Sequence, residues 1–321
     1  MAHIKTKDIN PDIRLAGMIA RPLLARMNEK SFRRAQRLMN KFMKGHLPNN
    51  MNVEQRYIDR PDGSKLRLLV VLPKAPKPSA TGVLWLHGGG YALGVPEMDL
   101  HYARKIQAVT NSVVVMPDYR LSIEAPYPAA LSDAYLALKW FKNNAQQLGV
   151  NPQQLFVAGD SAGGGLTAAL TLYARDQHEI DVAFQMPLYP MIDDQPTESS
   201  KNNDAPVWNT YNNRHAWQLY LAVNMAPVIY RNTRHRHERW ITDICHRPIP
   251  SSAPSNPSTM KRGSTSLTSK KAGVPASIDI YTGGFHALDL FGGKSELGKE
   301  ATEKWQHALK YASEHYFSEE N

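Results

Sequence analysis

The chain has 321 residues, of which 42% are hydrophobic and 21% charged, and this length and composition are typical of one large α/β domain. Its single cysteine, Cys245, excludes an internal disulfide framework and any metal site built from several cysteines. The N-terminus has no apolar run like that of a signal peptide, and arginines interrupt its first hydrophobic stretch. We therefore expect a cytoplasmic protein without a membrane span.

The net charge of +9 is concentrated in residues 223–271. This segment holds nine Lys and Arg residues against two acids, a surplus of +7 that leaves +2 for the rest of the chain. A basic surplus ordinarily indicates nucleic acid or an anionic membrane surface as the partner. Because the surplus is confined to one segment, we expect no nucleic-acid partner, and a nucleic-acid-binding protein is kept only as the third alternative.

Residues 8–46 have the pattern of helices. Ile13, Leu15, Ile19, Leu23 and Leu24 give an approximate helical spacing, and Phe32, Leu38, Phe42 and Met43 repeat it after a break at Pro22. Basic residues on the other face are typical of a solvated face on a packed helix, with a membrane-surface helix as the alternative. Next, Pro61-Asp-Gly-Ser64 separates residues 56–60 from residues 66–72, which predicts a hairpin.

From Gly82 onward, short apolar strands alternate with helices. We expect strands over 83–86, 112–116, 155–158 and 182–188, and helices over 96–109, 129–144 and 166–174. Fully apolar strands in this alternation indicate a parallel sheet covered by helices on both faces, and hence an α/β fold. In such sheets the ligand site lies at the carboxyl ends of the strands.

His87-Gly88-Gly89-Gly90-Tyr91 directly follows the first of these strands. Three glycines let backbone N–H groups point into one small space, as an oxyanion hole requires. We expect Gly88 and Gly89 to supply two donors and Ala162, in the motif described next, a third. A glycine-rich phosphate loop is the alternative.

The strand over 155–158 ends in Gly159-Asp160-Ser161-Ala162-Gly163, and a helix follows. A serine at such a strand–turn–helix junction fits the nucleophile elbow G-x-S-x-G. Glycines are needed because the turn strains the serine backbone and leaves no space for neighbouring side chains. The serine then lies at a helix N-terminus, which stabilises negative charge. A glycine-rich loop without a catalytic role is the alternative.

Tyr281-Thr-Gly-Gly-Phe-His286 follows a short strand predicted over 276–280. In hydrolases whose triad runs serine, acid, histidine along the chain, the histidine falls on a loop after the last strand. His286 is therefore the predicted general base for Ser161.

These stretches resemble the hormone-sensitive-lipase-like carboxylesterases of the α/β-hydrolase fold. The likeness is carried by residues 87–94, 118–121, 125–135, 159–165 and 284–287, and in order and spacing it covers residues 82–222 and 271–311. It implies Ser161 as nucleophile, His286 as base, and the helical residues 1–50 as a cap segment on an α/β-hydrolase domain at residues 51–321. No metal or cofactor is implied.

The chain departs from the family where the triad acid belongs. Residues 251–260 contain no acid, and the prolines at 248, 250, 254 and 257 are incompatible with the buried strand expected there. Asp243 and Asp279 are the remaining candidates, both disfavoured. Reading the codons of residues 240–262 one frame away permits a family-like strand and acid motif. We hypothesise a frameshift that begins between about residues 222 and 231 and ends before Lys270, leaving residues 223–270 as a disordered, insert-like segment.

The sequence thus predicts a carboxylic-ester hydrolase that acts on small short-acyl esters and is impaired by the missing acid. The alternative is a catalytically defective protein, frameshifted or a pseudoenzyme, that retains only the pocket. The expected partner is a small-molecule ester, and a homodimer is left open.

Overall fold

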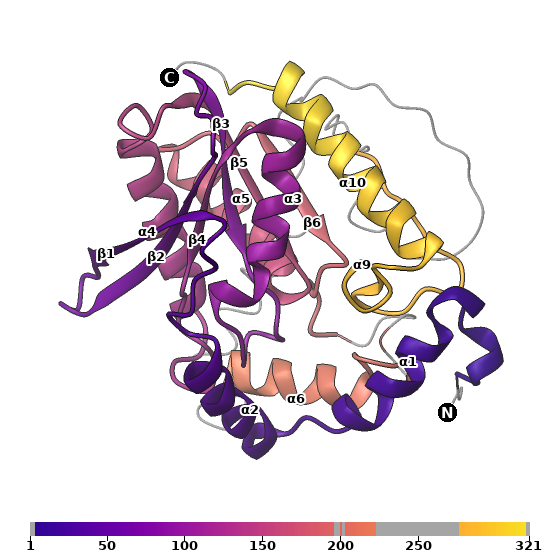
Figure 1. Cartoon of the computed structure of the whole chain (residues 1–321). Coiled ribbons are helices and arrows are strands. Elements are labelled where there is room, and N and C mark those ends of the chain that lie inside the picture. The colour runs from indigo at the N-terminus through magenta and orange to yellow at the C-terminus, as the bar shows by residue number, and fades with distance from the viewer. Residues whose placement is uncertain (1–3, 196–199, 201–202, 223–275, 319–321) are drawn as a thin grey trace. The chain divides into compact units, whose positions relative to one another are not determined.

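The computed structural model describes residues 4–195, 200, 203–222 and 276–318 (Figure 1). The chain divides into two compact units. The sheet unit comprises Arg26–Ile192, His215–Tyr220 and Trp305–Asn321, and the helical unit comprises Met1–Ala25, Asp193–Arg214 and Leu221–Lys304. The domain boundary at residue 50 stays a prediction, and the hypothesised aberrant segment lies outside the described residues.

Six strands of the sheet unit form one mixed, mostly parallel sheet in the order β1-β2-β4-β3-β5-β6. The strands are β1 (Asn52–Asp59), β2 (Lys65–Leu72), β3 (Ala80–Leu86), β4 (Val113–Pro117), β5 (Val150–Asp160) and β6 (Phe184–Leu188). The pairs β1–β2 and β2–β4 are antiparallel, whereas β3 pairs in parallel with both β4 and β5, and β5 with β6. The predicted hairpin and the predicted parallel strands are confirmed.

Helices cover both faces of this sheet (Figure 1). On one face, Tyr102 of α3 (Leu100–Thr110) stacks on Trp85 of β3 at 4.4 Å between ring centroids, and Trp305 of α10 (Glu296–His315) packs beside it. On the other face lie α4 (Ala129–Asn143) and α5 (Ala162–Gln177), with Phe141 of α4 filling the space above Gly82. Alternate residues of the central strands therefore enter two separate apolar layers.

The helical unit is built around α1 (Pro11–Leu24), which follows the short η1 (Thr6–Asp8). The predicted break at Pro22 is wrong: this proline lies near the end of α1, where it removes one backbone donor, and the helix continues to Leu24. The buried residues of α1 are Ile13, Gly17 and Ala20.

The predicted apolar stripe of α1 is also wrong in part, because Leu15, Ile19 and Leu23 are exposed. Close packing explains the choice of small buried residues. A Cβ atom built on Gly17 would lie 3.0 Å from the Phe285 ring, so a larger side chain at this position would require neighbouring side chains to shift.

The helix α2 (Glu29–Phe42) belongs to the sheet unit. The side chain of Asn28 accepts a hydrogen bond from the Ser31 N–H at 3.0 Å, which caps the helix start. Phe32 and Gln36 are its buried residues, whereas the predicted core residues Leu38 and Phe42 are 52% and 63% exposed.

The short strand predicted over residues 276–280 is wrong. These residues form no strand in the structure, and Ile278 and Ile280 are 47% and 45% exposed. Their apolar side chains therefore do not enter a sheet core. The remaining helices of the described residues are η2 (Pro96–Asp99), α6 (Thr210–Leu221) and α9 (Leu288–Phe291).

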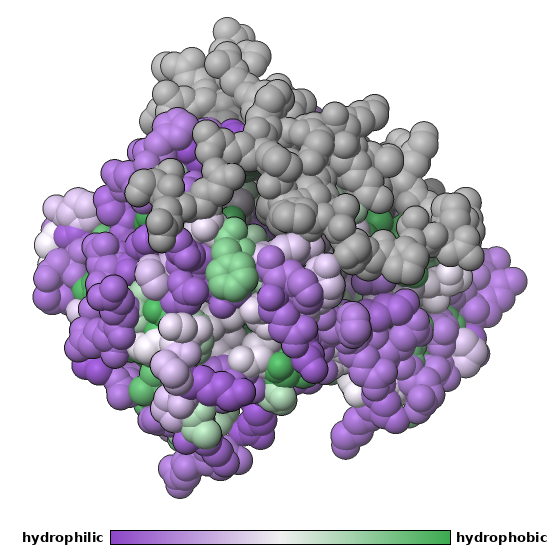
Figure 2. Space-filling model, turned by 90° about the horizontal axis from the view of Figure 1, so that it is seen from above, coloured by the Kyte–Doolittle hydropathy of each residue, from purple (hydrophilic) through white to green (hydrophobic). Residues whose placement is uncertain are grey.

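Described residues seen in Figure 2 present a mostly hydrophilic surface with scattered apolar side chains, as is normal for a surface in water. None of the helices in the described ranges has the length and apolarity that crossing a bilayer requires.

Candidate active site

Ser161 occupies a sharp turn between the end of β5 and the start of α5. Its backbone lies in the left-handed region at φ +53° and ψ −114°, which is a strained conformation for any residue except glycine. The Ser161 N–H donates to the Leu188 carbonyl at 2.9 Å, and the Met191 N–H donates to the Ser161 carbonyl at 2.8 Å. The Ser161 backbone is thus tied to the last residue of β6 and to the segment just after it, and the predicted strand–turn–helix arrangement is confirmed.

Glycines on either side of Ser161 lie against the backbone of β3. A Cβ atom built on Gly159 would lie 2.4 Å from the Leu86 carbonyl oxygen, and one built on Gly163 would lie 1.9 Å from the same atom. Any side chain at either position would force β3 and α5 apart. These two glycines therefore allow the serine turn to lie directly against the backbone of β3.

The glycine loop at residues 87–90 packs directly against this turn. A Cβ atom built on Gly88 would lie 2.5 Å from a carboxylate oxygen of Asp160, the residue before the serine. Gly89 has φ +113°, and a Cβ there would lie 1.9 Å from the Leu93 carbonyl oxygen. The structure therefore places Gly88 against the residue that precedes Ser161 and Ala162, and these residues belong with Gly89 to the sheet unit.

The backbone N–H groups expected to bind the oxyanion come from the glycine loop and from Ala162. Within the described part of the chain, the N–H groups of Gly88, Gly89 and Ala162 donate to no backbone carbonyl in a turn, loop or cap. Ala162 is also the first residue of α5, where helical geometry leaves N–H groups without an intrahelical acceptor. The arrangement has the chemistry of an anion-binding site, since such donors and the helix dipole favour negative charge.

Tyr91 and Met191 link the glycine loop to the serine turn. The Tyr91 hydroxyl donates to the Met191 carbonyl at 2.9 Å, and the Met191 N–H donates to Ser161. Tyr91 also stacks on Tyr220 at 4.0 Å between ring centroids. A rigid connection of this kind keeps the loop and the turn in one fixed arrangement.

His87 is a buried support of the glycine loop. Its Nδ1 lies 2.8 Å from the Gly88 carbonyl oxygen, which can only accept, so the proton is on Nδ1. Its ring stacks on Tyr119, whose hydroxyl donates to the His87 carbonyl at 2.6 Å. Burial lowers the pKa of His87, the charges of Asp99 and Asp118 oppose this shift only in part, and the imidazole is neutral at pH 7.

This depressed pKa predicts acid-sensitive stability. Since the folded pKa of His87 lies below the unfolded value near 6.5, its contribution to stability is complete above pH 6.5 and is lost as the pH falls toward the folded pKa. We expect the unfolding free energy of the wild type to fall more steeply than that of His87→Asn below pH 6.5, by up to about 1.4 kcal/mol per pH unit. Urea denaturation between pH 7.5 and 5 measures both slopes, and equal slopes would contradict a neutral buried His87.

His286, the predicted general base, belongs to the helical unit. Its half-buried ring lies 6.0 Å from the Trp208 ring, and Ala287 after it has φ +60° at the start of α9. Because His286 and Ser161 lie in different units, their pairing stays a prediction.

Of the two disfavoured acid candidates, Asp279 is exposed in the helical unit, with the Lys304 ammonium 3.9 Å away, and Asp243 lies outside the described residues. A further acid that the sequence pattern did not single out is Asp289 of α9, which is only 4% exposed and lies three residues after His286. A charged residue in an otherwise apolar Leu-Asp-Leu-Phe turn was the available signal.

Residues 83–248, more than half of the chain, match the family described as the alpha/beta hydrolase fold. The chain therefore belongs to the α/β-hydrolase family, and the resemblance and fold predicted from the sequence are confirmed.

Among curated proteins, the chain is 35% identical to the carboxylesterase NlhH of Mycobacterium tuberculosis over 159 residues, which are 49% of this chain and 50% of that protein. It is 36% identical to the esterase LipI of the same organism over 155 residues, 47% of this chain and 48% of LipI. The chain thus spans about half the length of the curated relatives that it matches.

Among solved structures, a bacterial heroin esterase has a TM-score of 0.77 at 23% identity, over 96% of this chain and 99% of that one. This likeness shows a shared fold along nearly the whole chain.

Proposed function

We propose that this protein is a carboxylic-ester hydrolase that acts on small esters with short acyl groups. The observation that carries the proposal is the strained Ser161 at the start of α5, with Gly88 of the glycine loop packed against the neighbouring Asp160. A reactive serine beside a cluster of backbone donors is the arrangement that acyl transfer needs. The names of the relatives, carboxylesterase and esterase, support the same reaction class.

In the acylation step, the Ser161 hydroxyl attacks the ester carbonyl while His286 takes the hydroxyl proton. The carbonyl oxygen becomes an oxyanion, which the N–H groups of Gly88, Gly89 and Ala162 stabilise. The tetrahedral intermediate then collapses, the bond to the alcohol oxygen breaks, and His286 returns its proton to the departing alkoxide. An acyl-enzyme and a free alcohol are the products of this step.

In the deacylation step, His286 removes a proton from water, and the resulting hydroxide attacks the acyl-enzyme. A second oxyanion forms in the same site and collapses as the bond to the Ser161 oxygen breaks. His286 returns its proton to that oxygen, which releases the carboxylic acid and restores the Ser161 hydroxyl. The N-terminus of α5 favours both oxyanions, because its dipole places partial positive charge there.

Loss of the orienting acid lowers the rate of this reaction. Without a carboxylate on its second nitrogen, the His286 imidazole is held less well in the productive tautomer, which costs on the order of 10⁴-fold in kcat. The absence of an acid in residues 251–260 therefore favours a slow enzyme, and a catalytically defective protein is the alternative function.

Hydrolysis of p-nitrophenyl acetate, butyrate and octanoate at pH 8 tests the proposal. We expect kcat/KM for the acetate and butyrate to exceed that for the octanoate, and His286→Ala to lower kcat by about 10²-fold, because base and nucleophile act as one unit. The matched control is His307→Ala, which removes an exposed imidazole from α10 and is expected to leave kcat unchanged.

The outcomes separate the two candidate functions. No hydrolysis above the buffer rate, with a folded protein by circular dichroism, would favour the defective protein. Activity that His286→Ala leaves unchanged would remove His286 from the mechanism while leaving Ser161 to be tested independently.

A further inference from the structure

Gly94, four residues after the glycine loop of residues 87–90, is held by a side chain of α2. The Gln36 carboxamide donates from Nε2 to the Gly94 carbonyl at 3.0 Å, and the Gly94 N–H donates to Gln36 Oε1 at 2.7 Å. Gln36 is 5% exposed, and 58 residues separate it from Gly94 along the chain. One side chain thus satisfies both polar backbone groups of a buried glycine, as a neighbouring β-strand would.

Gly94 in turn lies against the start of the glycine loop. It has φ +131°, and a Cβ built on it would lie 2.4 Å from His87 Nδ1 and 2.9 Å from the Gly88 carbonyl oxygen. These are the two groups joined by the hydrogen bond that orients the His87 ring. Because interiors are closely packed, a shift of Gly94 would move His87 and Gly88 with it.

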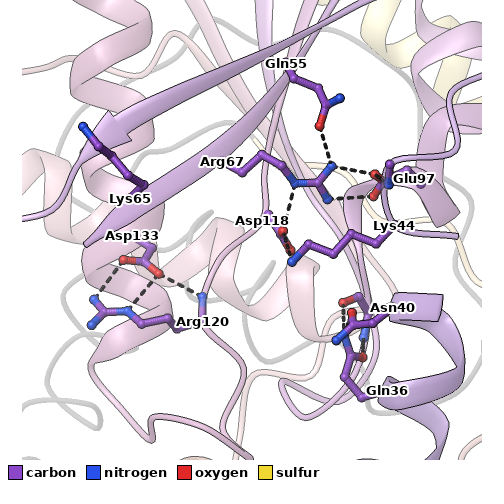
Figure 3. Close-up of polar contacts among 12 residues, drawn as sticks. Gln36, Asn40, Lys44, Gln55, Lys65, Arg67, Glu97, Asp118, Arg120 and Asp133 are labelled. Carbon is purple, nitrogen blue, oxygen red and sulfur yellow. Dashed lines mark hydrogen bonds and ion pairs between the residues drawn. The ribbon is translucent and has the colours of Figure 1, made fainter.

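An ionic network centred on the buried Arg67 ties the residues that follow α2 to the same part of the chain (Figure 3). The Gly45 N–H donates to a Glu97 carboxylate oxygen at 2.6 Å, and the Lys44 ammonium lies 2.7 Å from Asp118. Arg67 joins the two carboxylates, with contacts of 2.6 and 3.0 Å to Glu97 and 3.0 Å to Asp118. Burial alone would lower the pKa of Arg67, but its hydrogen bonds and the negative charges outweigh burial and raise it.

The network fixes how close α2 lies to residues 94–97. Glu97 lies only three residues after Gly94. The side chains of Arg67 and Glu97 are almost fully buried, at 6% and 2% exposed. Buried charged groups of this kind permit little displacement, because separating them would leave a charge without a partner. The position of the Gln36 carboxamide is therefore set by its two hydrogen bonds to Gly94 and by the network that holds the end of α2.

We propose that Gln36 is a positioning residue for ester hydrolysis, which acts through Gly94 to hold His87 and Gly88 where the oxyanion donors are needed. The proposal rests on the proposed function in assigning that role to Gly88. Gln36 itself does not touch the substrate. It restricts the loop before the reaction, so that the donors need not reorganise as charge develops on the carbonyl oxygen.

The first test compares Gln36→Ala with Arg37→Ala, a matched change of the adjacent exposed residue of α2. We expect Gln36→Ala to lower kcat for p-nitrophenyl acetate at least about tenfold with KM within about twofold, because only the transition state carries the oxyanion. Arg37→Ala is expected to leave both constants unchanged. A Gln36→Ala enzyme with wild-type kcat would overturn the proposal.

The second test uses Gln36→Glu, which is isosteric with glutamine. The ionised carboxylate accepts from the Gly94 N–H but cannot donate to the Gly94 carbonyl, whereas the protonated acid can do both. We expect the ratio of Gln36→Glu to wild-type kcat to rise as the pH falls from 8 to 5. The pH dependence that both proteins share cancels in the ratio. His87, the titratable side chain packed on Gly94, changes the ratio only in so far as the introduced carboxylate shifts its pKa. A ratio independent of pH would contradict a hydrogen-bonding role.

The third test does not depend on turnover. Amide hydrogen exchange in a peptide covering residues 87–95 reports how firmly the loop is held, even if the wild type hydrolyses no ester. We expect faster exchange there in Gln36→Ala than in the wild type and Arg37→Ala, with unchanged exchange in β3. Equal exchange would overturn the proposal, whereas a missing ester activity with altered exchange would instead count against the proposed function.

Discussion

Ser161→Ala is expected to lower kcat for p-nitrophenyl acetate by about 10²-fold and to abolish labelling of the protein by a fluorophosphonate. The size follows from how triad members depend on one another. In a serine protease with a complete triad, loss of the serine costs about 10⁶ in kcat and loss of the acid alone about 10⁴, so removing the serine after the acid costs only about 10² more. The remaining rate comes from substrate binding and the backbone donors, which alanine leaves in place.

The magnitude of this loss also tests whether the triad acid is missing. A loss near 10⁶-fold would mean that another carboxylate orients His286, and the buried Asp289 would then be the first candidate to substitute. An unchanged kcat would contradict the assignment of Ser161 as nucleophile. The matched control is Ser132→Ala, which removes an exposed hydroxyl from α4 of the same unit and is expected to change neither kcat nor labelling.

The sheet and the serine turn were predictable because their signals are local. The central strands are short apolar runs that only a sheet covered on both faces can bury, and β3 to β6 lie where these runs predict. Gly159 and Gly163 mark positions where the neighbouring backbone leaves no space for a side chain. Both signals, the apolar runs and the glycine positions, lie in residues that are close together in the sequence, so their spacing alone predicts the structure.

Features that depend on distant packing were not predictable in the same way. The apolar spacing of α1 suggested that Leu15 and Ile19 are buried, but Gly17 and Ala20 are buried instead, and the Phe285 ring lies close to Gly17. The apolar residues before His286 resembled a strand, yet a strand also needs a partner with free backbone groups, which its own sequence does not specify.

Gln36 shows the same limit in the candidate site. A glutamine in a basic helix, between Arg33, Arg34 and Arg37, is indistinguishable by pattern from a solvated residue. Its role depends on the backbone of Gly94, and no local periodicity connects positions 58 residues apart. Local motifs therefore locate the reacting groups, whereas the residues that support them emerge only once the elements are packed.

Gly163→Ala is expected to destabilise the sheet unit by at least about 3 kcal/mol, at the upper end for a small-to-large change in a packed interior. The new methyl group would lie 1.9 Å from the Leu86 carbonyl oxygen and 2.6 Å from that of His87. Both atoms are backbone, so relief requires moving α5 away from β3 rather than rotating a side chain. Urea denaturation, with the midpoint and the slope measured together, gives the change in unfolding free energy.

Gly164→Ala, at the next position of α5, is the matched control for this experiment. Its new methyl group would lie 2.9 Å from the Leu188 carbonyl oxygen and 3.1 Å from that of Gly159, a much smaller overlap. The gain in helix propensity from glycine to alanine, about 1 kcal/mol, is the same for both substitutions and offsets part of each cost. We therefore expect the Gly164 variant to lose far less stability than the Gly163 variant. Equal losses would mean that α5 does not rest on the β3 backbone as closely as the serine turn requires.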